Sequence, residues 1–255
     1  MKPLVSVVIP TFNVAKYLPE TLESLKKQTI KKALFETIII DDCSTDDTFN
    51  ICKKYKNKLG VLVGNNKNYG AAYTKNKGIL LAQGKYIMLL DGDDLFEPET
   101  IEKTLEFMQT SPELEFSYSR HKRINEKGEF ICNRPGYEFS RERLLHFNFV
   151  GAVECFSKNL FKKLQGFDDS CYVEDYDFSL RASEVLNNNQ FRQNPLYLYQ
   201  YRIHNSNKSN NLDVKRKAAA LAIQNSLKRK EGINTEVFWS HITNRYNYFD
   251  WEEKK

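Results

Sequence analysis

The segment Tyr86-Ile87-Met88-Leu89-Leu90-Asp91-Gly92-Asp93-Asp94 joins an apolar run to three acidic residues within four positions. The apolar part shows no polar alternation, which is typical of a parallel strand covered on both faces. Ligands of open α/β sheets bind at the carboxyl ends of the strands, so the acidic residues are expected at a binding edge. Carboxylates about 5 Å apart repel each other by about 3 kcal/mol per pair at an effective dielectric of about 20. A hard cation held by one or two of them together with substrate phosphate oxygens would offset this repulsion, although an acidic turn that only caps a helix fits the segment alone as well.

Similar apolar runs precede this segment and alternate with helical stretches. Strands are expected at 4–9, 35–40, 60–63 and 86–90. Helices are expected at 14–28, after the capping residues Ser44 to Asp47, and at 71–82. This βαβ rhythm predicts an α/β fold with a mostly parallel sheet.

The rest of the chain is less regular. We expect helices at 98–110, 158–164 and 175–185, strands at 116–118, 130–132, 153–156 and 196–203, and a turn at 125–128. From Asp213 onward, apolar residues recur at helical spacing among lysines and arginines, and an aromatic end follows. This tail is equally consistent with packing on the rest of the protein, a homodimer contact or contact with an anionic membrane surface.

The composition excludes several classes of protein. The 255 residues include 38 Lys and Arg against 33 Asp and Glu, a net charge of +5, without the concentrated basic face of a nucleic-acid-binding protein. No apolar run approaches the roughly 20 residues that span a bilayer, and the N-terminus lacks a signal-peptide pattern. We therefore expect a cytoplasmic protein without a transmembrane segment, peripheral to the inner face of the membrane at most. The five cysteines form no C-x-x-C pair, so free thiols are expected.

Two further polar clusters follow predicted strands on the same edge. Asp41 and Asp42 end the second strand and are followed by Ser44 and Asp46. A carboxylate there can accept from a base or a ribose, and capping of the next helix explains some of these residues equally well. Pro10-Thr11-Phe12-Asn13 ends the first strand, where Phe12 either stacks on a planar base or packs as an ordinary aromatic.

Downstream, Glu174-Asp175-Tyr176-Asp177 begins a predicted helix. A carboxylate in this position is a helix cap or, if it faces a cleft, a general base. Arg202-Ile203-His204-Asn205-Ser206 follows the late strand and offers a cation, an imidazole and a hydroxyl suited to a phosphate or a metal.

Taken together, these segments resemble the family 2 glycosyltransferases of the GT-A fold. The matching pieces are 6–13, 40–48, 68–70 with Asn76 and Gly78, 90–94, 166–168 and 174–177. The resemblance covers roughly residues 4 to 206 and does not reach the tail. It implies a Rossmann-like, mostly parallel sheet flanked by helices, divided into a nucleotide-sugar-binding subdomain (1–110), a subdomain for the acceptor and the catalytic base (111–210) and a helical tail (211–255).

The resemblance also implies an activity and a set of site residues. The activity is inverting, metal-dependent transfer of a sugar from a nucleotide sugar, often UDP-linked, to a hydroxyl of a glycan or lipid-linked acceptor. Asp175 would be the catalytic base, and Asp93 with His204 would hold Mn²⁺ or Mg²⁺. The residues implied to bind the nucleotide are Pro10, Thr11, Asn13, Asp42, Asn68 and Asp91, and those implied to contact the diphosphate are Arg202 and Ser206. The Q-x-x-R-W segment of many processive members is absent from the sequence, so addition of single sugars is expected.

Two alternative functions fit the sequence less well. A sugar-phosphate nucleotidyltransferase would need a glycine-rich loop after the first strand, and Pro10-Thr11-Phe12-Asn13 contains no glycine. A non-catalytic nucleotide-sugar or glycan-binding protein on the same fold would have no need of Asp91, Asp93 and Asp175 together. The sugar and the acceptor depend on the stretch from about 115 to 150, which carries no readable pattern.

Overall fold

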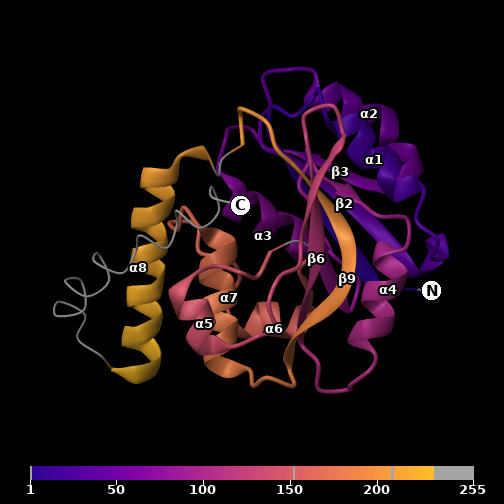
Figure 1. The fold of residues 1–255 in the computed structure, drawn as a ribbon. Helices are drawn as coiled ribbons and strands as arrows, with labels where there is room; N and C mark the ends of the chain where they lie inside the picture. Colours follow the sequence, from indigo (N-terminus) through magenta and orange to yellow (C-terminus); the bar gives the residue numbers. More distant parts are fainter. Residues whose placement is uncertain (1, 152, 208–209, 233–255) are drawn as a thin grey trace.

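The computed structural model describes residues 2–151, 153–207 and 210–232, which form a mixed α/β fold (Figure 1). Its centre is one nine-stranded sheet in the order β3-β2-β1-β4-β8-β6-β9-β5, with β7 paired to β6. The strands are β1 Val5–Thr11, β2 Phe35–Asp41, β3 Gly60–Gly64, β4 Tyr86–Leu89, β5 Leu95–Phe96, β6 Phe116–Ile124, β7 Phe130–Arg134, β8 Cys155–Ser157 and β9 Phe191–Arg202.

The first four strands in this order are parallel, as the apolar runs predict. β8 then pairs antiparallel with both β4 and β6, and β9 runs parallel to β6. The sheet is therefore continuous through the boundary expected near residue 110. The short β5, next to the acidic segment, even pairs with β9 at the far edge.

Helices cover both faces of the sheet (Figure 1). α1 Leu18–Lys26, α2 Thr48–Leu59 and α4 Thr100–Met108 lie on one side. On the other side lie α3 Ala71–Leu81, α5 Arg141–His146, α6 Lys158–Lys163 and α7 Glu174–Val185. A short 3-10 turn, η1 Lys32–Leu34, precedes β2.

Alternation along the strands explains how one sheet supports two cores. In β1, Val8 packs with Ile79 of α3, whereas Val7 and Ile9 pack with the leucines of α1. Successive strand side chains point to opposite faces, and in β1 both faces are apolar. A strand without polar alternation therefore has helices on both sides, as the sequence predicts.

The described part of the tail packs on the rest of the protein. α8 Leu212–Glu231 lies beside α7 and buries Ala219, Ala222, Ile223 and Leu227. Ser226 and Arg229 of α8 hydrogen-bond to the carboxylate of Glu184 near the end of α7. The helical prediction for this stretch is confirmed, and the aromatic end at 233–255 lies outside the described residues. No helix among the described residues is long and apolar enough to cross a membrane.

Gly78 lets α3 lie close to the sheet, and its replacement by alanine is expected to cost about 2 kcal/mol of unfolding free energy, within the range for overpacking. An added Cβ would stand 2.4 Å from Cγ1 of Val8 and 3.2 Å from Cγ1 of Ile40. Both are buried, branched side chains, so helix or sheet must move. Urea unfolding measures the loss. Leu80→Ala, at a 73% exposed position of the same helix, is the control, expected within about 0.5 kcal/mol of wild type. An equally stable Gly78→Ala variant would contradict the close packing.

Candidate active site

The carboxyl ends of the parallel strands bring the predicted polar segments together at one edge. Thr11 at the end of β1 is in register with Asp41 at the end of β2, and its hydroxyl donates to Oδ1 of Asp41 at 3.3 Å. Asn13, with a left-handed φ of 52°, accepts from the backbone N–H of Thr45 at 2.8 Å. The first two edge loops are therefore tied to each other. Thr11 is buried and Asn13 is exposed.

Asp42 organises the next loop of this edge. Its carboxylate accepts from Nδ2 of Asn65 at 2.7 Å and from the backbone N–H groups of Tyr69 and Gly70 at 3.0 and 2.8 Å. Asn68 is exposed in this loop, and its side-chain oxygen also accepts from Gly70. Asp42 thus holds the loop that leads into α3. A nucleotide base bound beside Asp42 would contact a loop that is already in place.

Lys75 of α3 is the centre of the site, and the sequence interpretation missed it. Its Nζ lies 3.1 Å from Oε1 of Glu174 and 2.5 Å from Oδ1 of Asp175, at the start of α7. The side chains of Lys75 and Glu174 are 4% and 5% exposed, whereas that of Asp175 is 39% exposed. Of the two carboxylates paired with Lys75, Asp175 is therefore the one that a substrate can reach.

The charges of this cluster are strongly coupled. Burial alone would lower the pKa of Lys75, but Asp175, Glu174 and Asp91 outweigh it and raise the pKa well above its usual value. Asp91 is open to solvent, yet desolvation by the surrounding protein, reinforced by Asp93 and Asp175 against Lys75, raises its pKa to about 6. A perturbed carboxylate with a specific charged partner is typical of a functional site, as expected of a binding edge.

A second group lies beside this cluster. It pairs Asp93 of the acidic segment with His204, which follows β9. Oδ2 of Asp93 is 2.9 Å from Nε2 of His204, and Nδ1 of the same ring is 2.9 Å from Oγ of Ser206. The ring of Tyr17 packs on His204 with centroids 4.5 Å apart. The structure therefore brings together the two residues implied as metal ligands, and it uses Ser206 to orient the imidazole.

Arg202, which the resemblance implies as a diphosphate contact, is held by protein acceptors in the structure. It is 1% exposed. Its Nε donates to the backbone oxygen of Asp93, Nη1 to that of Glu126, and Nη2 to Oε2 of Glu20. Each guanidinium nitrogen thus has a protein acceptor, which favours a role in holding the acidic segment over contact with a diphosphate. Buried Asp94 adds to this tie by accepting from the backbone N–H of Arg202 at 2.7 Å.

The side chains of the site fit a divalent ion that takes some of its ligands from the protein and the rest from a substrate. No group of three or more His, Cys, Asp and Glu side chains is arranged to hold a metal within residues 2–151, 153–207 and 210–232. Asp93 and His204 together supply an oxygen and a nitrogen. Mg²⁺ and similar ions are commonly held by one or two protein ligands plus substrate phosphates. A metal-binding histidine usually has a partner on its second ring nitrogen, as Ser206 provides here.

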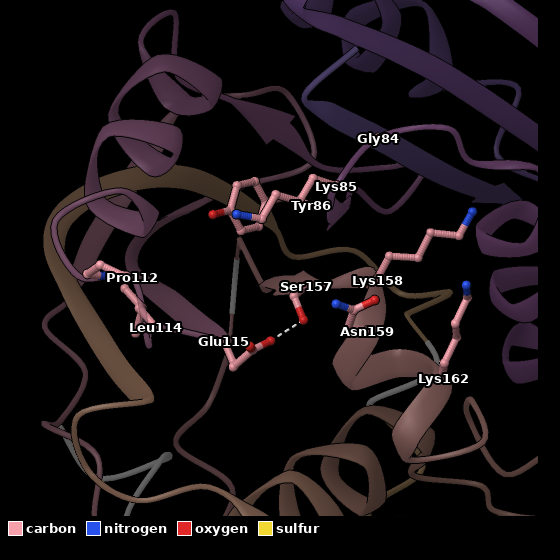
Figure 2. Close-up of a pocket in the computed structure, with 10 residues that line it drawn as sticks. All are labelled: Gly84, Lys85, Tyr86, Pro112, Leu114, Glu115, Ser157, Lys158, Asn159 and Lys162. Atoms are coloured by element: carbon pink, nitrogen blue, oxygen red, sulfur yellow. Dashed lines mark hydrogen bonds between the residues drawn. The ribbon is translucent and has the colours of Figure 1, made fainter. Parts of the chain in front are cut away.

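The cavity in Figure 2 is not part of this site. It has a volume of about 210 Å³ and is lined by residues from the beginning of β4, such as Tyr86, and from the end of β8, such as Ser157. Asp91 follows the other end of β4. The cavity therefore lies at the opposite edge of the sheet from the acidic residues.

Replacing Lys75 with methionine is expected to lower the unfolding free energy by about 3 kcal/mol, because breaking a buried ion pair leaves uncompensated charge. Glu174 and Asp175 would lose their common partner, with Asp91 close by. Chemical denaturation checks the value. Lys77→Met, on the same helix but bonded to Asn65, is the matched control, and an equal loss in both variants would contradict a special role for Lys75.

An open α/β sheet with carboxylates gathered at the carboxyl edge is the arrangement of enzymes that bind nucleotides. Comparison with known proteins specifies the class. The sequence pattern of the family described as "Glycosyl transferase family 2" matches residues 6–165. Chondroitin synthase of Escherichia coli is 33% identical over 98% of this chain and 36% of its own length. An uncharacterized glycosyltransferase of Methanocaldococcus jannaschii is 31% identical over 80% of this chain and 72% of its own.

Among solved structures, TarS 1-349 of S. aureus in complex with UDP superposes with a TM-score of 0.70 and 25% identity over 91% of this chain and 67% of that chain. The chain therefore belongs to glycosyl transferase family 2 and is an enzyme of the GT-A fold. It spans about a third of the length of the chondroitin synthase that it matches.

Proposed function

We propose that the protein transfers a sugar from a UDP-linked donor to a hydroxyl of a glycan or lipid-linked acceptor, one sugar at a time and with inversion. The observation that carries the proposal is the cluster of Asp91 and Asp175 around Lys75, which joins the edge of the sheet to the start of α7. The similarity to TarS, solved with UDP, supports uracil as the base. A non-catalytic binding protein would have no use for an accessible carboxylate paired with a buried lysine.

In this proposal Asp175 takes the proton from the acceptor hydroxyl. Its ion pair with Lys75 fixes the carboxylate that would accept the proton. Because the hydroxyl becomes strongly acidic only late in the displacement, a carboxylate is a sufficient base. Attack in line with the departing diphosphate then inverts the anomeric centre.

The nucleotide lies along the sheet edge in the same proposal. Asp42 contacts the uracil beside Pro10, Thr11, Asn13 and Asn68, and Asp91 contacts the ribose region. Asp93 and His204 would hold Mn²⁺ or Mg²⁺, and such an ion would supply positive charge to neutralise the leaving diphosphate. Ser206 keeps the imidazole of His204 oriented at 2.9 Å, and Arg202 holds the acidic segment in place from behind.

A calorimetric screen of nucleotide sugars with and without Mn²⁺ tests the proposal. We expect UDP-sugars to bind and GDP- and CMP-sugars to bind at least about tenfold more weakly, since a site that hydrogen-bonds one base leaves its polar groups unpaired with another. Binding should strengthen when Mn²⁺ or Mg²⁺ is added. A chain that binds no nucleotide sugar under either condition would overturn the proposed function.

A further inference from the structure

A further buried carboxylate belongs to this cluster. Glu154 lies just before β8, and its backbone oxygen accepts from the N–H of Leu89 at 3.4 Å, so it stands beside the end of β4. It is 7% exposed, and its Oε2 finds no hydrogen-bond partner among the described residues. Native proteins rarely leave a buried polar atom in this state, and such an atom calls for an explanation.

The surroundings of Glu154 place it inside the site. The side chains that act on it most strongly are Asp175, Lys75, Asp91 and Glu174. Together with burial, the three carboxylates raise the pKa of Glu154 well above its usual value, and Lys75 opposes them. Its position is therefore costly for stability, and the attraction of Lys75 opposes that cost.

The backbone before Glu154 is also strained. Val153 has a left-handed φ of 45°, which is rare for a branched side chain. Strained backbone of this kind persists where the surrounding structure enforces it, often at binding sites. The strain occurs where the chain enters β8 and therefore where the carboxylate of Glu154 is positioned.

The order of strands indicates which part of a donor would reach Glu154. Asp42 follows β2, whereas Glu154 precedes β8, and β1 and β4 lie between them. Three strand spacings amount to about 14 Å, so a group bound at Asp42 and a group bound at Glu154 belong to opposite ends of a long ligand. Among its neighbours, Asp91 is assigned to the ribose region and Asp175 to the acceptor hydroxyl. The group that lies between a ribose and an acceptor is the sugar to be transferred.

We propose that Glu154 is a specificity-determining residue for the donor sugar, and that its Oε2 accepts a hydrogen bond from a hydroxyl of that sugar. This inference rests on the proposed function. A hydroxyl donates to a carboxylate without adding charge, so it satisfies the buried oxygen in a cluster that already has an excess of negative charge. Because Glu154 is far less exposed than Asp175, it lies on the buried side of the cluster, where the transferred sugar is proposed to bind, and not on the side that an acceptor reaches from solvent.

The test measures, without any acceptor, the ratio of the dissociation constant of a UDP-sugar to that of UDP. The probes are UDP, UDP-glucose, UDP-galactose and UDP-N-acetylglucosamine, titrated by calorimetry with Mn²⁺ present. For the tightest-binding sugar, Glu154→Ala is expected to raise the ratio about 10- to 100-fold, as for leaving a buried hydroxyl of the sugar without its hydrogen-bond partner. UDP itself should bind within about threefold of wild type, and Glu154→Gln should raise the ratio less, because its amide oxygen still accepts.

Glu115→Gln is the matched control. Glu115 also bonds a β8 residue, since Ser157 donates to its carboxylate at the other end of that strand, as Figure 2 shows. This variant should leave both constants unchanged. Thermal unfolding confirms that each variant folds; if Glu154→Ala does not, Glu154→Leu, which fills more of the space and has no acceptor, takes its place, and an unchanged ratio in that variant overturns the proposal.

The other outcomes distinguish a failure of this proposal from a failure of the proposed function on which it rests. Equal weakening of UDP and the UDP-sugar in Glu154→Ala would assign Glu154 to the nucleotide and overturn the inference, and unchanged binding of both would overturn it too. Neither outcome affects the proposed glycosyltransfer. If the wild-type protein bound no UDP-sugar, the proposed function would be overturned, and the inference with it.

Discussion

Asp175→Asn is expected to lower the turnover number about 10³-fold while the donor still binds, because general base catalysis contributes about 10² to 10⁴ in rate. Asparagine has nearly the shape of aspartate but cannot take up a proton. Its side-chain oxygen can still accept from Lys75, which also keeps Glu174 as a partner. The fold and the donor site should therefore persist, and calorimetry with the UDP-sugar should give an affinity within about threefold of wild type.

The control for this change is Asp213→Asn. Asp213 lies in the first turn of α8, just as Asp175 lies in the first turn of α7. Asp213 is exposed, and its helix carries none of the site residues. It should leave turnover unchanged. If Asp175→Asn abolished donor binding together with turnover, Asp175 would have a structural role and not that of a base.

Asp93→Asn is expected to remove the metal-dependent part of turnover, a loss of about 10³-fold, since stabilising charge on the leaving group is worth several kcal/mol. The amide is a poorer ligand for Mn²⁺ than the carboxylate. It can still hydrogen-bond to Nε2 of His204, so the melting temperature should change little. The measurement compares initial rates at saturating UDP-sugar with added Mn²⁺ and with a chelator.

In wild type the two rates should differ widely, and in Asp93→Asn they should coincide. Asp213→Asn should keep the wild-type difference. Turnover of Asp93→Asn equal to that of wild type, with the same response to the chelator, would refute the assignment of Asp93 as a metal ligand.

The parallel half of the fold was predictable because its strands are apolar on both faces and each ends in polar residues. The edge positions of Asp42, Asp91 and Asp93 follow from that pattern and from the rule that such ends share one edge. The second half was harder. α5 and the two-residue β5 are too short for periodicity to appear, and β9 begins five positions before the predicted 196 because Pro195 and polar neighbours hide its start.

Lys75 and Glu154 were missed for a related reason, since each is a single charge outside any motif. Both left a signal. Ala72, Lys75 and Ile79 share one buried face of α3, so a lysine there needs a buried partner. Glu154 interrupts an apolar run from 149 to 156. Arg202 shows the converse limit: its place beside the site was predictable, but only the structure shows that its guanidinium donates to Asp93, Glu126 and Glu20.

The packing of α8 on α7 has a practical consequence for anyone who shortens the protein. α7 carries Asp175 in its first turn and Glu184 in its last. The carboxylate of Glu184 accepts hydrogen bonds from Ser226 and Arg229 of α8. A recombinant fragment that stops before Leu212 would lack α8, expose the apolar flank of α7 and free one end of the helix that bears Asp175. Such a fragment would turn over slowly although every residue of the site is present, and its inactivity would say nothing about the chemistry.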